Sequence, residues 1–146
     1  MRFSIILGAL LLVASTLGFA ADLPALTPAE AIDQAKTGRV KGYFEFTVKR
    51  TGRDHKSFYL NSEENYRLPT SLNVEIPRGL ASDLEEMLGA DIDSLVGQRV
   101  RIEGVGRRLK IYTGVEKLGD GRAEKRRYYH QTQVRLRDID RLTVLN

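Results

Sequence analysis

The chain alternates apolar and polar residues through most of its length, and two short segments have a helical period instead. From Val40 to Lys49, apolar or small residues occupy every second position, which predicts a strand with one buried face. The same alternation predicts further strands around Phe58–Leu60, Leu72–Ile76, Val100–Ile102 and Val134–Leu136. In these strands Tyr43 and Tyr59 fall on the polar, outward face.

Two helices are predicted, one before the first strand and one after the third. The segment from Leu26 to Gly38 begins with Thr27, Pro28 and Glu30, which together form a capping box with proline in the first turn. The second helix carries apolar residues at helical spacing and ends at a glycine. Its apolar positions are Leu80, Leu84, Met87 and Leu88.

Turn residues divide the strands. Thr51–Asp54 predicts a turn, so that Arg50–Lys56 forms the loop between the first two strands. Thr113–Arg127 is predicted as the loop between the last two strands. Gly104 and Gly106 indicate a bulge or tight bend within the fourth strand.

The first twenty residues are typical of a secretory signal peptide. Arg2 precedes an apolar run that ends in small residues near Ala20, and the alternative of an uncleaved membrane anchor is disfavoured because the run is short for a bilayer. We therefore expect a periplasmic or secreted protein with a linker and short helix over 21–38 and one domain over 39–146. The chain has no cysteine, so its core must stabilise it without disulfides.

Charge is distributed unevenly along the chain. Residues 22–96 contain nine Lys or Arg and thirteen Asp or Glu, a net charge of −4, whereas residues 97–146 contain thirteen and six, a net charge of +7. A basic C-terminal half indicates either an anionic partner or an internal charge asymmetry, and the two readings stay open at this point.

The order of strands and helices resembles the oligonucleotide/oligosaccharide-binding (OB) fold. The segments that carry the resemblance are GRVKGYFEFTVKR, KSFYLNSEENYR, TSLNVEIP and LVGQRVRIEGVG. With the signal peptide, the chain is similar to small bacterial periplasmic OB-fold proteins. The resemblance implies a mainly β fold, namely a five-stranded Greek-key barrel with a helix between strands three and four, plus the extra N-terminal helix. An SH3-like barrel is the alternative, and the internal helix argues against it.

An OB fold places its ligand across the central strands, between the two loops described above. Outward tyrosines and loop cations then form the candidate ligand-binding set, because aromatic rings stack on bases or sugars while cations follow a charged backbone. The set is Tyr43, Arg50, Arg53, Lys56, Tyr59, Lys117, Arg122, Lys125, Arg126, Arg127 and Tyr128. The competing interpretation is that the charged loops are simply solvated, and one of Tyr128 and Tyr129 is expected in the core.

The sequence offers no recognisable catalytic constellation. His55 and His130 are the only histidines, and no zinc, calcium or phosphate-loop pattern occurs. We therefore expect a non-enzymatic, monomeric binding protein without a cofactor or metal, which recognises an anionic oligonucleotide, acidic glycan or envelope polymer. Export disfavours nucleic acid. The alternative function is an envelope stress-associated scaffold for a protein partner, with a nuclease as a distant third.

Overall fold

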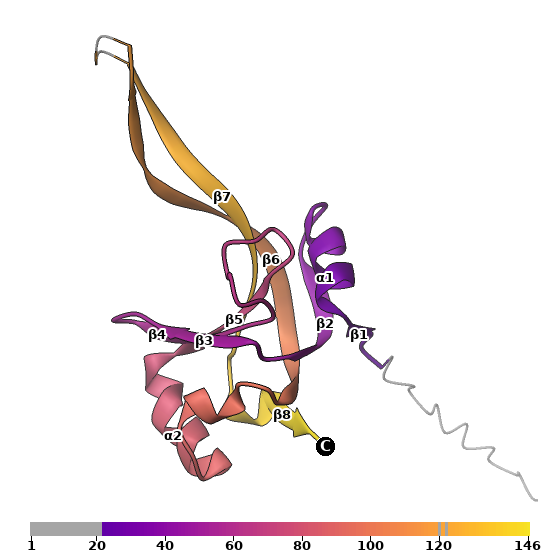
Figure 1. Cartoon of the computed structure of the whole chain (residues 1–146). Helices are drawn as coiled ribbons and strands as arrows, with labels where there is room; N and C mark the ends of the chain where they lie inside the picture. The colour runs from indigo at the N-terminus through magenta and orange to yellow at the C-terminus, as the bar shows by residue number, and fades with distance from the viewer. Residues whose placement is uncertain (1–21, 120, 122) are drawn as a thin grey trace, which may run out of the picture.

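The computed structural model describes residues 22–119, 121 and 123–146, which fold mainly as β-structure (Figure 1). The expected signal peptide at residues 1–20 lies outside the described residues. The elements in chain order are β1 (Ala25–Leu26), α1 (Pro28–Ala35), β2 (Val40–Thr47), β3 (Arg50–Arg53), β4 (Ser57–Asn61), β5 (Leu72–Pro77), α2 (Arg78–Leu88), the 3-10 helix η1 (Ile92–Leu95), β6 (Arg99–Leu118), β7 (Ala123–Arg135), the 3-10 helix η2 (Ile139–Arg141) and β8 (Leu142–Leu145).

The strands form one mixed sheet in the order β1-β2-β6-β7-β5-β4-β3, and β8 pairs with β6 outside this path. The β1/β2 and β5/β7 pairs are parallel and the others are antiparallel. The mainly β class is confirmed. The helix predicted between the third and fourth strands is also confirmed, because α2 lies between β5 and β6. The predicted linker is more ordered than expected, because Ala25 and Leu26 pair with β2 and Leu26 is buried.

Strands β2 and β3 lie at distant positions in the sheet order but are joined by only two residues, Val48 and Lys49. The Val48 backbone N–H donates to Gln98 beside β6, at 2.9 Å. The next N–H, that of Lys49, donates to Asn61 of β4, also at 2.9 Å. Consecutive residues therefore bond to two different parts of the sheet, so the chain bends sharply between them.

The helices form where the sequence predicts them. In α1 the Thr27 hydroxyl accepts a hydrogen bond from the Glu30 backbone N–H and the Glu30 carboxylate accepts one from the Thr27 N–H, which confirms the capping box. In α2, Leu84 is fully buried, and Leu80 and Leu88 are partly buried against the core.

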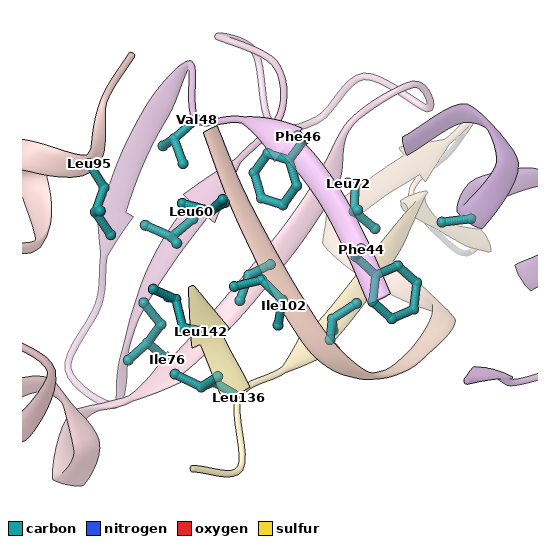
Figure 2. Packing of buried hydrophobic residues seen from close by; sticks show 14 of the residues in the cluster. Phe44, Phe46, Val48, Leu60, Leu72, Ile76, Leu95, Ile102, Leu136 and Leu142 are labelled. Carbon is teal, nitrogen blue, oxygen red and sulfur yellow. The ribbon is translucent and has the colours of Figure 1, made fainter. Parts of the chain in front are cut away.

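Buried aliphatic and aromatic residues from both long and short strands form one core. Figure 2 shows Phe44 of β2, Leu72 of β5 and Ile102 of β6 in this cluster, with Leu142 of β8 nearby. These residues fall at the positions that the alternation predicts. Two other inward predictions are only partly met or wrong: Phe58 is partly buried, and Met87 is 45% exposed on the outer side of α2.

The predicted loop at Arg50–Lys56 is mostly strand. Residues Arg50–Arg53 form β3 and pair antiparallel with β4, so only residues 54–56 make the turn. The Asp54 carboxylate closes this turn by accepting hydrogen bonds from the backbone N–H groups of Lys56, at 2.7 Å, and Ser57, at 2.8 Å. The turn therefore lies after the predicted position at Thr51–Asp54. The reason is that the Asp54 side chain accepts hydrogen bonds from residues that follow Asp54 in the chain.

The predicted loop at Thr113–Arg127 is also largely wrong. Strands β6 and β7 continue as a long antiparallel hairpin that projects from the body of the protein, and we call its described residues 107–119, 121 and 123–130 the arm (Figure 1). Glu116 lies opposite Lys125, and Lys117 lies opposite Glu124. Opposite charges at facing positions stabilise an antiparallel pair, so residues that resembled a solvated loop support strand pairing instead.

Gly104 and Gly106 are required by close packing. A Cβ atom on Gly104 would lie 2.8 Å from Val134 Cγ1, and one on Gly106 would lie 3.1 Å from the Phe44 ring. The register shift that indicates a bulge lies further along β6, between Tyr112 and Gly114. The sequence was therefore right that these glycines mark a special position and wrong that the position is the bulge.

Gly104→Ala is expected to lower the free energy of unfolding by about 1–3 kcal/mol, because the added methyl group overlaps the buried Val134 side chain. Gly38→Ala is the matched control, since no atom lies within 4 Å of its added Cβ, and its stability should stay unchanged or rise by up to about 1 kcal/mol. Urea unfolding followed by circular dichroism measures both. Equal stability of the two variants would contradict the packing role of Gly104.

Candidate functional site

A cleft of about 500 Å³ lies between the β3–β4 hairpin and the part of β6 and β7 that leads into the arm. We call it the cleft. Its lining residues come from β3, β4, the β4–β5 connection, β6 and β7. They are Arg50, Thr51, Gly52, Arg53, Asp54, Tyr59, Asn61, Tyr66, Ile111, Tyr129, Gln131 and Gln133.

Two buried amides form the floor of the cleft. Asn61 is 3% exposed and Gln131 is 9% exposed, and neither side chain makes a hydrogen bond to another described residue. No side-chain nitrogen or oxygen that is fully closed to solvent lacks a partner in the described part of the chain. The free hydrogen-bonding capacity of these two amides therefore faces the cleft, where an amide offers both a donor and an acceptor.

Strand register explains how the amides come together. Asn61 of β4 lies opposite Asn73 of β5, which in turn lies beside Gln133 of β7. Gln131 is two residues before Gln133 and so shares its face. Asn73 is fully buried, and the Ser71 hydroxyl donates a hydrogen bond to its side-chain oxygen at 3.2 Å. Asn73 therefore lies between Asn61 and Gln133 as the buried middle residue of the three.

Three tyrosines line the walls of the cleft. Tyr59 lies on β4, Tyr66 on the β4–β5 connection and Tyr129 on β7. Each is partly buried, and burial raises the pKa of the Tyr129 hydroxyl. Their rings provide flat apolar surfaces beside the polar floor, an arrangement suited to ring-shaped ligands that also carry hydrogen-bonding groups.

The Tyr59 hydroxyl is fixed by the turn that precedes β4. It donates to the Asp54 carboxylate at 2.9 Å. Burial, followed by this hydrogen bond, raises the pKa of Tyr59 to about 12. Hydrogen bonds from the Lys56 backbone N–H and the Tyr59 hydroxyl lower the pKa of Asp54. The Asp54 carboxylate is therefore engaged in stabilising the turn.

Two arginines bring positive charge to the cleft. Arg50 Nη1 donates to the Glu64 carbonyl oxygen at 3.2 Å, and Arg53 Nη2 contacts the Asp93 carboxylate at 3.3 Å. The Arg53–Asp93 pair is more than half exposed on both sides, so it is weak and its guanidinium remains accessible to an anion. The cleft is therefore polar and aromatic with moderate positive charge.

The structure brings Arg50, Arg53 and Tyr59 of the predicted set together in the cleft. Tyr43 lies elsewhere on β2, beneath the Arg101 guanidinium, and Lys56 lies in the turn outside the cleft lining. The remaining predicted residues belong to the arm and do not line the cleft. They are Lys117, Lys125, Arg126, Arg127 and Tyr128, while Arg122 lies outside the described residues.

Tyr128 and Tyr129 point to opposite faces of the arm, as expected, but neither enters the core. Tyr128 is 50% exposed and packs edge-on against Tyr112 at 6.2 Å between ring centres. Lys110 Nζ lies 3.9 Å from the centre of the Tyr128 ring, a cation–π contact. Tyr129, which was not in the predicted set, is the member of the pair that lines the cleft.

Alternation within two strands contained the signal for the residues that were missed. Tyr59 and Asn61 are two residues apart, as are Tyr129, Gln131 and Gln133. Such a spacing places all members of each group on one outward face. Recognising the cleft also required the knowledge that β4 and β7 lie on either side of β5, which the spacing alone does not reveal.

The described residues contain no group of three or more His, Asp or Glu side chains that could hold a metal ion. Within the same residues, no helix has the length and apolar character needed to cross a membrane. No protein-family model matches the chain, and no curated protein matches it significantly. The chemistry of the cleft is therefore the basis for assigning a function.

Alkaline titration tests the environment of Tyr59. Because the folded state raises its pKa above the ordinary value of 10, its contribution to stability is fully present below pH 10 and is lost as the pH rises through about 12. Tyrosinate absorbance should show a step near pH 12 that disappears in Tyr59→Phe, whereas the ionisation of Tyr129, whose pKa is also raised, should remain. Asp54→Asn should lower that pKa but leave it above 10, since burial is the larger cause. A Tyr59→Phe titration curve with the late step intact would contradict this assignment.

Proposed function

We propose that the chain is an exported, non-enzymatic binding protein that takes a segment of an acidic glycan into the cleft. The supporting observation is the pair of buried amides without described partners at the floor of the cleft, flanked by tyrosine rings and two arginines. Sugar hydroxyls match the donor and acceptor groups of amides, and sugar rings pack on aromatic faces. The arginines suit carboxylate or sulfate groups on the same ligand.

The strand connections support an OB barrel as the frame of this site. Residues Val48 and Lys49 link β2 to β3, so β2 and β3 together act as one bent strand that connects the two sides of the sheet. The β3–β4 hairpin and the β6–β7 hairpin then correspond to the connections that flank an OB ligand site. Export to the periplasm or cell exterior is part of the proposal and rests on the N-terminal sequence pattern.

The charge of the cleft favours a glycan over a nucleic acid. Only Arg50 and Arg53 line it as cations, and Asp54 is used internally. A single-stranded oligonucleotide that engaged these two cations would lose affinity with a log–log salt slope of about −1.4. Oligonucleotide binding through these two cations would therefore be weak, and an oligonucleotide serves as the comparison ligand.

Gly52→Leu tests the cleft directly. A Cβ atom at Gly52 would meet nothing closer than Asn61 Nδ2 and Tyr59 Cβ, both at 4.0 Å, so the backbone there has room for a side chain, and a leucine would occupy part of the cleft. We expect unchanged thermal stability and at least a tenfold loss of affinity for a labelled uronic-acid oligosaccharide, measured by fluorescence anisotropy. Gly38→Leu is the control, because Gly38 lies outside the cleft and has open space around it.

The proposal fails if the wild-type protein does not bind the uronic-acid probe at micromolar concentration, or if Gly52→Leu binds it as well as Gly38→Leu does. Tighter binding of oligo(dT) than of the glycan, lost in Gly52→Leu, would keep the cleft as the site but change the ligand class to nucleic acid.

The arm favours a second candidate function, contact with a protein partner. Four of its large apolar or aromatic side chains are exposed to solvent, with exposed fractions of 43–56%. These are Tyr112, Val115, Leu118 and Tyr128. An exposed apolar surface on a projecting hairpin is suited to protein contact.

A photo-crosslinking residue at Val115 should capture one specific envelope protein in intact cells, whereas the same residue at Asp83, which is exposed on α2, should not. Capture from neither position would remove this candidate, and equal capture from both would show non-specific contact.

A further inference from the structure

A second concave site lies apart from the cleft, and six of its nine lining residues are cations. Its volume is about 270 Å³, and we call it the basic pocket. The cations come from the start of β2, from β6, from the end of β7 and the segment after it, and from η2. They are Arg39, Lys41, Arg107, Arg135, Arg137 and Arg141. None of these residues lines the cleft.

Acidic partners within the described residues neutralise only part of this charge. Arg141 Nη1 contacts Glu103 Oε1 at 2.6 Å, and Arg135 Nη1 lies 3.5 Å from Glu75 Oε1. Arg39, Lys41, Arg107 and Arg137 make no ion pair with a described acidic residue. Glu103 is the single carboxylate that lines the pocket. The pocket therefore retains a positive charge of several units in a small volume.

Two other arginines of β6, in contrast to Arg107, make ion pairs with a described carboxylate. Arg99 and Arg101 of β6 both contact the Glu45 carboxylate of β2, at 3.1 and 2.6 Å. The fold thus supplies a carboxylate beside one group of β6 arginines and none beside Arg107. Like charges held close together disfavour the folded state, and an anionic ligand would remove that repulsion.

We propose that the basic pocket binds a compact anion that carries two or more phosphate groups. Five of its six cations are arginines, whose planar guanidinium groups donate paired hydrogen bonds to phosphate oxygens. The volume of about 270 Å³ lies just below the usual range for ligand pockets, which suits a pyrophosphate-sized group better than a larger ligand. Four unpaired cations match the several charges of such a group.

This chemistry occurs both in soluble oligophosphates and in phosphorylated lipid headgroups, and one experiment separates the two sources. Isothermal titration calorimetry at low ionic strength uses inorganic pyrophosphate, orthophosphate and citrate as soluble probes. Sedimentation uses phosphatidylcholine vesicles with and without phosphatidylinositol 4,5-bisphosphate, whose headgroup carries more than one phosphate group. We expect pyrophosphate to bind and to raise the melting temperature, and orthophosphate to bind at least about tenfold more weakly.

Arg137→Gln and Arg39→Gln should each weaken pyrophosphate binding at least about tenfold, because each removes a charged hydrogen-bond donor. Arg99→Gln is the matched control. It also removes one positive charge, but from a part of β6 outside the pocket, and Arg101 still pairs with Glu45. Pyrophosphate binding should therefore change less than twofold. The two pocket variants should keep or slightly raise the melting temperature without ligand, since they relieve repulsion, which shows that a loss of binding is not a loss of folding.

Loss of vesicle binding together with pyrophosphate binding in Arg137→Gln would assign the pocket to a phosphorylated headgroup, and loss of pyrophosphate binding alone would assign it to a soluble oligophosphate. Three results would overturn the proposal: binding of neither pyrophosphate nor the anionic vesicles, an affinity for citrate equal to that for pyrophosphate, or a loss of pyrophosphate affinity in Arg99→Gln equal to that in the pocket variants. The cleft is unaffected by these variants, so Gly52→Leu can fail or succeed independently.

Discussion

Close packing of Phe44 and Val134 over the glycines of β6 is the contact on which the arrangement of the sheet depends. The first half of β6 pairs with β2 and β8, and from Gly106 onward the strand pairs with β7. Gly106 is paired with Val40 on one side and Val134 on the other, so it is the residue where the partners overlap. Side chains at Gly104 and Gly106 would push these strands apart.

This packing also positions the cleft and the basic pocket, the two sites for which functions are proposed. Because β6 continues past Val40, the first residue of β2, its second half extends with β7 away from the body as the arm (Figure 1). Where the arm leaves the body, Ile111 and Tyr129 face the β3–β4 hairpin and complete the cleft. The basic pocket forms beside the same region, where Arg107 of β6 lies near the start of β2. One uninterrupted strand therefore contributes to both proposed sites.

Local periodicity was sufficient to predict much of the fold. The capping box at Thr27 and Glu30 and the buried positions of Phe44 and Ile102 depend on residues close in sequence, so their pattern is visible without tertiary information. The arm could not be predicted in this way. Its oppositely charged residues, such as Glu116 and Lys125, face each other only when two segments pair in one register, and before pairing the same residues are typical of a polar loop.

The candidate site shows the same division. Arg50, Arg53 and Tyr59 were predicted because all three lie in or beside one hairpin. Asn61 and Gln131 were missed because they belong to distant strands that approach only through β5. The choice of Tyr128 over Tyr129 was wrong for the cleft because adjacent residues in a strand face opposite sides, and only the pairing with β6 determines which side meets β3 and β4.

The two proposed sites differ in chemistry although one pair of facing residues connects them. Arg107 and Gln133 lie opposite each other in the β6–β7 ladder, and Arg107 lines the basic pocket while Gln133 lines the cleft. The cleft side has amides and tyrosines with few cations, whereas the pocket side has cations without amides. Hydrogen-bonding groups that recognise ring-shaped units with few charges gain little from dense positive charge, which would instead attract any anion. On the two proposals made above, separation of the cations into their own pocket would allow the cleft to select its ligand by shape and hydrogen bonding, while the pocket would select by charge.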